Sequence, residues 1–146
     1  MRGALLGGAV LVFAIAPACA AEIAAPGAPK VTFETVAKTN TTIIGQNFSI
    51  PQNPNVVATI ATFPPGASLP IHRHPYAHYV YVLDGVLTVT NAQTGQVFTV
   101  KKGDFIVEMV NTWHTGKNNG TVPVRLLTID QFPAGVTSNV EFPAAK

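Results

Sequence analysis

The sequence has little charge, and this shortage limits the partners that the protein can have. Charged residues make up 11% of the 146 residues, whereas hydrophobic residues make up 47%. The longest basic run is the pair Lys101 and Lys102, so the chain lacks the clustered cations that bind nucleic acids or anionic membrane surfaces. The apolar content is sufficient for a packed core and argues against disorder over most of the length.

Cysteine is also scarce, and the single Cys19 lies in a segment that is typical of an export signal. Arg2 precedes an apolar stretch at residues 4–16, which is too short to span a bilayer comfortably, and Ala18-Cys19-Ala20 fits the small-x-small cleavage rule. We therefore expect residues 1–20 to be a signal peptide and the mature protein to be secreted or periplasmic, without a membrane anchor. Such a protein has no disulfide, Fe–S or thiolate chemistry. A lipid anchor on Cys19 is the alternative, but the preceding residues fit the Leu-led lipoprotein pattern poorly.

Helical periodicity is missing as well, and the remaining pattern is that of β-strands. After a small-residue and proline-rich lead-in at residues 21–30, short alternating runs such as NVVATIATF, HYVYVLDG and VRLLTID are separated by turn residues. VTFETV, at residues 31–36, is the first of these expected strands. We expect one all-β sandwich or barrel domain at residues 31–136, followed by a C-terminal tail at residues 137–146.

All four histidines lie between residues 72 and 114. His72 and His74 leave the same face of an extended chain, and His78 begins an alternating strand. One isolated histidine would more often be an ordinary core or surface residue. The spacing argues against that interpretation here, because the first segment reads Gly66-x5-His72-x-His74-x3-His78-x6-Gly85 and the second reads Gly103-x5-Met109-x-Asn111-x2-His114-x3-Asn118.

These two segments resemble the motifs of the cupin superfamily, G-x5-H-x-H-x3-4-E-x6-G and G-x5-P-x-G-x2-H-x3-N. Every spacing fits, but His78 replaces Glu, Met109 replaces Pro and Asn111 replaces Gly. The resemblance covers roughly residues 56–130. It implies a double-stranded β-helix, or jelly-roll barrel, in which the four motif positions bind one metal ion at the mouth. Those positions are His72, His74, His78 and His114.

A histidine at position 78 would give a metal site with four nitrogen ligands. Nitrogen donors suit transition metals and disfavour Ca²⁺ and Mg²⁺, so we expect one divalent Mn, Fe, Cu, Ni or Zn ion as the cofactor. Four neutral imidazoles leave the charge of the ion uncompensated, which strengthens its Lewis acidity and favours anionic ligands. The alternatives are a degenerate site that binds nothing and a closed structural zinc site.

Two further residues are candidates for catalysis. Tyr76 lies beside the expected opening of the barrel. Glu108 and Met109 follow each other in a strand, so only one of them should face inward; we expect Met109 inside and Glu108 in solvent, because ionised side chains are rarely buried unpaired. If Glu108 faces inward instead, it is the natural general base. Arg73 is expected to be exposed, with capture of an anionic substrate as its alternative role.

Three functions remain open from the sequence. The favoured one is a dioxygenase-like oxidoreductase acting on a small, oxygen-rich organic substrate, because four protein ligands leave two positions for substrate and O2. The second is a non-redox isomerase or lyase, with the metal as Lewis acid and Tyr76 or Glu108 as base. The third is a periplasmic protein that binds a metal or small ligand without turnover. The resemblance also implies a homodimer, formed by pairing or exchange of edge strands such as residues 31–36.

Overall fold

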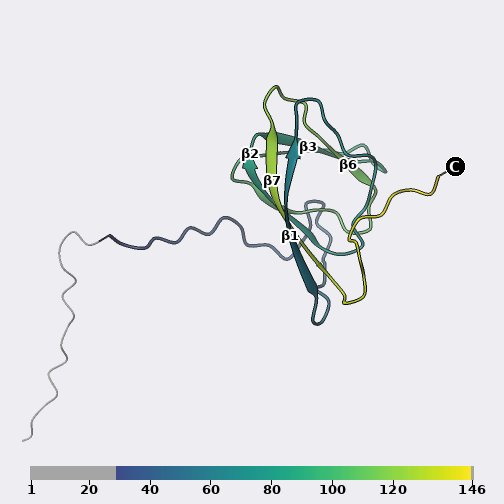
Figure 1. Ribbon diagram of the computed structural model, residues 1–146, viewed down its shortest axis with the longest axis horizontal. Coiled ribbons are helices and arrows are strands. Elements are labelled where there is room, and N and C mark those ends of the chain that lie inside the picture. Colours follow the sequence, from purple (N-terminus) through teal and green to yellow (C-terminus); the bar gives the residue numbers. More distant parts are fainter. Residues whose placement is uncertain (1–28, 146) are drawn as a thin grey trace, which may run out of the picture. The chain divides into compact units, whose positions relative to one another are not determined.

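The computed structural model describes residues 29–145 (Figure 1). The expected signal peptide and most of the lead-in lie outside these residues. Met1–Phe33 and Glu34–Lys146 are separate units, and the fold concerns the second. None of the described residues forms a helix long and apolar enough to cross a membrane.

Seven strands build the domain, and they form two antiparallel sheets. The strands are β1 (Asn55–Phe63), β2 (His78–Asp84), β3 (Val86–Asn91), β4 (Val97–Lys101), β5 (Phe105–Val107), β6 (His114–Lys117) and β7 (Val124–Phe132). One sheet has the order β1-β7-β2-β5 and the other has the order β4-β3-β6. Residues 29–145 contain no helix. The expected all-β jelly roll is confirmed.

The predicted alternation of inward and outward side chains is observed in β2. Val80 and Val82 are buried, at 1% and 0% exposure, and belong to a core cluster that also includes residues from β1, β3, β4 and β7. Tyr79 lies on the opposite face, where its ring is 6.2 Å from that of Phe105 and 6.0 Å from that of Phe48. His78 therefore shares the inner face with Val80, as the period of two requires.

The strand expected at residues 31–36 is not observed, and this expectation was wrong. Val31, Phe33 and Val36 are exposed and lie outside any strand. Strand formation depends on hydrogen bonding to a neighbouring strand, and the ladders recorded among residues 29–145 include none of these residues. Residues 41–47 instead pack on the domain, with the Ile43 amide donating to the Val107 carbonyl at 2.8 Å.

Two turn positions have the backbone conformation that their residue types favour. Asn111, which replaces the motif glycine, has φ of 52°, and asparagine tolerates this left-handed region better than most residues. Gly85 has φ of 80°, and an added Cβ would lie 2.8 Å from the Pro123 carbonyl oxygen. The motif glycine at position 85 is thus required by both conformation and space.

Gly85→Ala should therefore destabilise the domain more than the same change at Gly95. Gly95 has φ of 74° but no atom within 4 Å of an added Cβ, so Gly95→Ala should cost only about 1–2 kcal/mol for the left-handed backbone. Gly85→Ala adds about 1–3 kcal/mol of overpacking against backbone atoms that cannot easily shift. Urea unfolding of the two variants measures the difference in their free energies of unfolding. Equal decreases would show that the backbone near Pro123 shifts to accommodate the added methyl group at no energetic cost.

Candidate metal centre

Backbone pairing brings the two histidine segments together. The amide of His72 donates to the carbonyl of His114 at 2.9 Å, and the amide of His114 donates back at the same distance. The amide of Asn111 donates to the carbonyl of His74 at 2.8 Å. The segment that precedes β2 is therefore fixed against the start of β6 and the loop before it, which places His72, His74 and His114 in contact.

The three imidazoles are oriented in the same way. Each Nδ1 donates to a backbone carbonyl oxygen, and a carbonyl only accepts, so each Nδ1 carries a proton and Nε2 is the ring nitrogen left for the other members of the cluster. The bonds join His72 to Pro70 O at 2.8 Å, His74 to Asn139 O at 2.7 Å and His114 to Thr112 O at 2.8 Å. Metal-binding histidines are commonly oriented through their second ring nitrogen in this manner.

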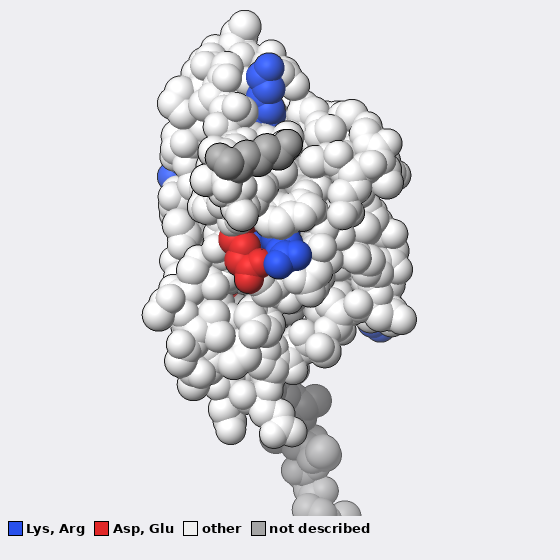
Figure 2. Space-filling view, turned by 90° about the vertical axis from the view of Figure 1, so that its right-hand side faces the viewer, with Lys and Arg blue, Asp and Glu red and all other residues white. Residues whose placement is uncertain are grey.

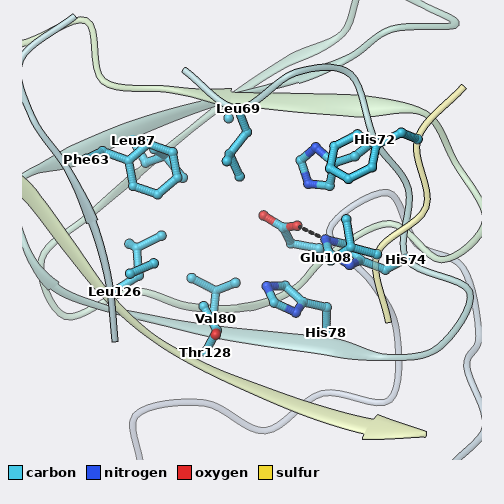
Figure 3. Close-up of a pocket in the computed structure, with 14 residues that line it drawn as sticks. Phe63, Leu69, His72, His74, His78, Val80, Leu87, Glu108, Leu126 and Thr128 are labelled. Atoms are coloured by element: carbon cyan, nitrogen blue, oxygen red, sulfur yellow. Dashed lines mark ion pairs between the residues drawn. The ribbon is translucent and has the colours of Figure 1, made fainter. Parts of the chain in front are cut away.

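Glu108 completes this cluster, and the expectation that it lies in solvent was wrong. Its side chain is buried, with 7% exposure of the residue, and it lines the same cavity as His72 and His74 (Figure 3). Oε2 of Glu108 lies 2.9 Å from Nε2 of His114 and 3.2 Å from Nε2 of His74. A carboxylate, which the expected four-histidine donor set did not include, is therefore among the candidate ligands.

The burial of Glu108 has a clear physical cause. Ile106 pairs with Val80 and so shares the inner face, and Glu108 continues that face two residues later. Met109 is also buried, as expected, and belongs to the core cluster that includes Val80 and Val82. Strand β5 ends at Val107, so the alternation of a strand no longer separates Glu108 from Met109, and both side chains are inside.

The cluster fits a metal ion. One donor atom from each of His72, His74, Glu108 and His114 can be chosen so that all lie within 4.8 Å of one another. Neighbouring ligands at about 2.1 Å from one ion are about 3 Å apart, close to the distances from Glu108 to His74 and His114. Nε2 of His74 is buried and has no hydrogen-bond partner, and such an atom is costly unless something binds it.

The charge states of the cluster also favour a cation. Burial lowers the pKa of His72 to about 4, so this imidazole is neutral near pH 7. Burial alone would raise the pKa of Glu108, but the hydrogen bond to His114 and the nearby imidazole of His74 hold it well below its usual range. Burial likewise opposes the rise in the pKa of His114 that its hydrogen bond to Glu108 causes. Glu108 is therefore an anion among the imidazoles, and His72 is a neutral nitrogen donor beside it.

His78 lines the same cavity but is held differently. Its Nδ1 lies 2.7 Å from Oδ1 of Asp130, and its ring stacks on that of His74 at 4.1 Å with an interplanar angle of 6°. The side-chain amide of Asn139 donates to the same oxygen of Asp130 at 2.6 Å. Burial alone would lower the pKa of His78, but its hydrogen bond to Asp130 raises it. His78, His74 and Asp130 form a second donor group, and a ligand role for His78 stays a prediction.

Tyr76 and Arg73 do not line the cavity. The backbone amide and carbonyl of Tyr76 bond to the side chain of Asn139. The Arg73 guanidinium bonds to Glu141 at 2.7 Å and lies 4.7 Å from the centre of the Trp113 ring. Arg73 thus fixes the C-terminal segment and is not placed to hold a substrate in the cavity.

The segment expected as a C-terminal tail contributes directly to the site. Asn139 is buried at 3% exposure, bonds to both His74 and Asp130, and the next residues, Val140 and Phe142, line the cavity. The sequence showed no spacing signal for these residues, because their contacts with residues 72–78 span more than 60 positions. Asp130 was missed for a similar reason, since its contact with His78 spans 52 positions.

The outer surface carries few charges on the side drawn in Figure 2, which is mostly uncharged. Acidic and basic side chains on that side meet in one small area, and no broad basic area is visible there. This agrees with the low charged content of the chain and gives that side no electrostatic feature for binding a nucleic acid.

Comparison with known proteins gives one family match and several similar solved structures. The model of the cupin domain matches residues 59–130. Similar solved structures include the oxalate decarboxylase of Lactobacillus farciminis, with 26% identity and a TM-score of 0.47 over 53% of this chain and 24% of that one. A putative sugar phosphate isomerase of Acidithiobacillus ferrooxidans has 28% identity and a TM-score of 0.46 over 52% of this chain and 49% of that one.

A third solved structure, from a pair of DMSP lyases, has 17% identity and a TM-score of 0.51 over 61% of this chain and 44% of that one, and it supports the fold alone. The chain thus spans about half or less of the length of these three structures. No curated protein sequence matches it.

Proposed function

This chain is a member of the cupin superfamily, and from that premise we propose that it is a metal-dependent enzyme with dioxygenase-like oxidoreductase activity. The ligands would be His72, His74, His114 and Glu108. The metal would be one divalent transition ion, since imidazole and carboxylate donors together suit Mn, Fe, Ni, Cu and Zn. The observation that carries the proposal is the convergence of three imidazoles, each bonded through Nδ1 to a backbone carbonyl, with one buried carboxylate.

When bound, the metal supplies Lewis acidity and, if it is redox-active, the electron exchange that reaction with O2 requires. The protein residues position and protect the reacting molecule. The carbonyl oxygens of Pro70, Asn139 and Thr112 fix the imidazole rings, and the apolar walls of the cavity exclude water. His78, oriented by Asp130, lies beside the donors and can hold or transfer a proton at Nε2.

A non-redox isomerase or lyase is the second candidate, and one observation favours it. One carboxylate oxygen of Glu108 makes the contact with His114, and Figure 3 shows the other turned towards the open middle of the cavity. A carboxylate in that position can accept a proton from a substrate carbon or hydroxyl.

Metal content and gas uptake test the proposed function. We expect purified protein to contain one transition metal per chain. Chelation should abolish turnover, and Mn, Fe or Cu should restore it with consumption of O2. Zinc restoring the same turnover under anaerobic conditions would favour the isomerase or lyase. Metal binding without turnover over a broad substrate panel would instead indicate a binding protein, the third function left open by the sequence.

We also propose that the protein is exported, because residues 1–20 have the charge, length and cleavage pattern of a signal peptide. The N-terminal residue of protein recovered from the periplasm or medium tests this proposal.

A homodimer is our proposal for the assembly. β1 pairs only with β7, and Val56, Val57 and Ile60 on this edge strand are exposed, which leaves an apolar strand open to a second copy. Light scattering measures the mass in solution, and a monomer at high concentration would exclude the dimer.

A further inference from the structure

The cavity beside the metal donors is divided into a polar end and a hydrocarbon end. Its volume is about 370 Å³, which is in the lower part of the range for small-molecule sites. Figure 3 shows the histidines and Glu108 on one side and Phe63, Leu87 and Leu126 on the other. The apolar lining side chains are Ala61, Phe63, Leu69, Val80, Leu87, Leu126, Val140 and Phe142.

The hydrocarbon end of the cavity has almost no hydrogen-bonding groups for a polar substrate. Apart from the histidines and Glu108, the only polar side chain that lines the cavity is Thr128, and no Lys or Arg is among the described residues that line it. A phosphate, a second carboxylate or several hydroxyl groups placed there would lose hydrogen bonds to water without replacement. The volume exceeds the roughly 150 Å³ of an apolar cavity that accepts benzene, so a ring or short alkyl chain fits.

The charge of the polar end selects the head group. This step depends on the proposed metal site. A divalent ion carries +2 and the Glu108 carboxylate carries −1, so the two together leave +1. A single carboxylate, enolate or phenolate would neutralise that charge, whereas a dianion would leave a second negative charge in a cavity that no Lys or Arg lines among the described residues. A site with four neutral imidazoles would instead have balanced a dianion.

We propose that the site takes a small molecule with one singly charged oxygen head group and a hydrocarbon body. The head lies at the donors and the body lies against Phe63, Leu87 and Leu126. Among the oxygen-rich substrates expected from the sequence, this proposal selects those whose oxygen atoms all lie at one end of the molecule. Oxalate and sugar phosphates, which the names of two similar structures suggest, are poor ligands for this cavity.

Calorimetric titration of the zinc-loaded protein tests this proposal without turnover. The ligands are acetate, butyrate, hexanoate and phenylacetate, compared with oxalate and succinate. Burial of each methylene should tighten binding about fourfold until the cavity is filled, and the dianions should bind no tighter than acetate. Affinity independent of chain length, or oxalate as the tightest ligand, would overturn the proposal.

A variant pair locates the binding. Leu69 lines the cavity and Val86 does not, and they are similarly exposed, at 45% and 47%. Leu69→Ser should weaken hexanoate binding about fourfold or more and leave acetate unchanged, whereas Val86→Ser should change neither. Equal effects of the two substitutions on hexanoate binding would mean that its alkyl chain binds outside this cavity, which would overturn the proposal.

A neutral probe separates this inference from the proposed metal site. Toluene binding to the metal-free protein, followed by ligand-observed NMR, needs no ion, and Leu69→Ser should weaken it. If zinc does not bind but toluene does, the metal site fails and the hydrocarbon pocket stands. If zinc binds but toluene does not, the hydrocarbon pocket fails alone.

Discussion

Replacing Glu108 by glutamine should lower the affinity for a divalent transition metal by at least about 100-fold, since even residues that only orient ligands contribute about 10–100-fold. Glutamine keeps the size of the side chain, and its amide can still hydrogen-bond His114, so the fold should be retained. What disappears is the anion 2.9 Å from His114 and 3.2 Å from His74. Competition with a chromophoric chelator measures the affinity, and circular dichroism confirms the fold.

Two further variants make this result specific. Glu34→Gln is the matched control, because it removes an exposed carboxylate that is not among the candidate ligands; its metal affinity should equal that of the unchanged protein. His78→Ala should keep one metal per chain and most of the affinity. Loss of the metal in His78→Ala together with full binding in Glu108→Gln would establish the four-nitrogen site instead and reject Glu108 as a ligand.

The histidine spacing predicted much of the site because it is a local property of two short segments. His72 and His74 share one face of an extended chain, and His114 lies at a fixed distance from a turn glycine, so both segments could be located without a structure. The cupin resemblance supplied the pairing of the two segments, which the bond between the His72 amide and the His114 carbonyl now shows.

The rest of the site depends on contacts that no local pattern records. Glu108 was placed in solvent because strand alternation was assumed to continue to Met109, whereas β5 ends at Val107 and both residues are buried. Asp130 and Asn139 reach His78 and His74 from more than 50 residues away. A buried carboxylate is improbable by itself, and only the converging imidazoles make this one favourable.

The same limit applies to the fold. Alternation and turn residues indicated β2, β7 and the loops at Gly85 and Gly103, since those signals act within a few residues. They also suggested a strand at residues 31–36, where the pattern is equally good but no partner strand occurs among the described residues. An alternating pattern indicates that a segment is able to form a strand. Whether the strand forms depends on a neighbouring strand with which it can pair.

Metal binding should also raise the thermal stability of the domain strongly. An ion that binds only the folded state, supplied at 1,000 times its Kd, stabilises by about 4 kcal/mol. For a domain of this size each kcal/mol shifts Tm by roughly 4 °C, so zinc or manganese should raise Tm by about 15 °C. The donors come from the segment before β2, from residue 108 and from β6, so the ion joins parts of the chain that separate on unfolding.

Scanning calorimetry of chelator-treated protein, with and without the metal, measures this shift. Calcium should give none, because it prefers a shell of oxygen ligands. Glu108→Gln and His114→Ala should lose most of the shift while keeping a cooperative transition in the metal-free state. An unchanged Tm on metal addition to the unmodified protein would mean that the four donors, although close and oriented, do not bind an ion. Glu108 and the histidines would then only stabilise one another within the fold.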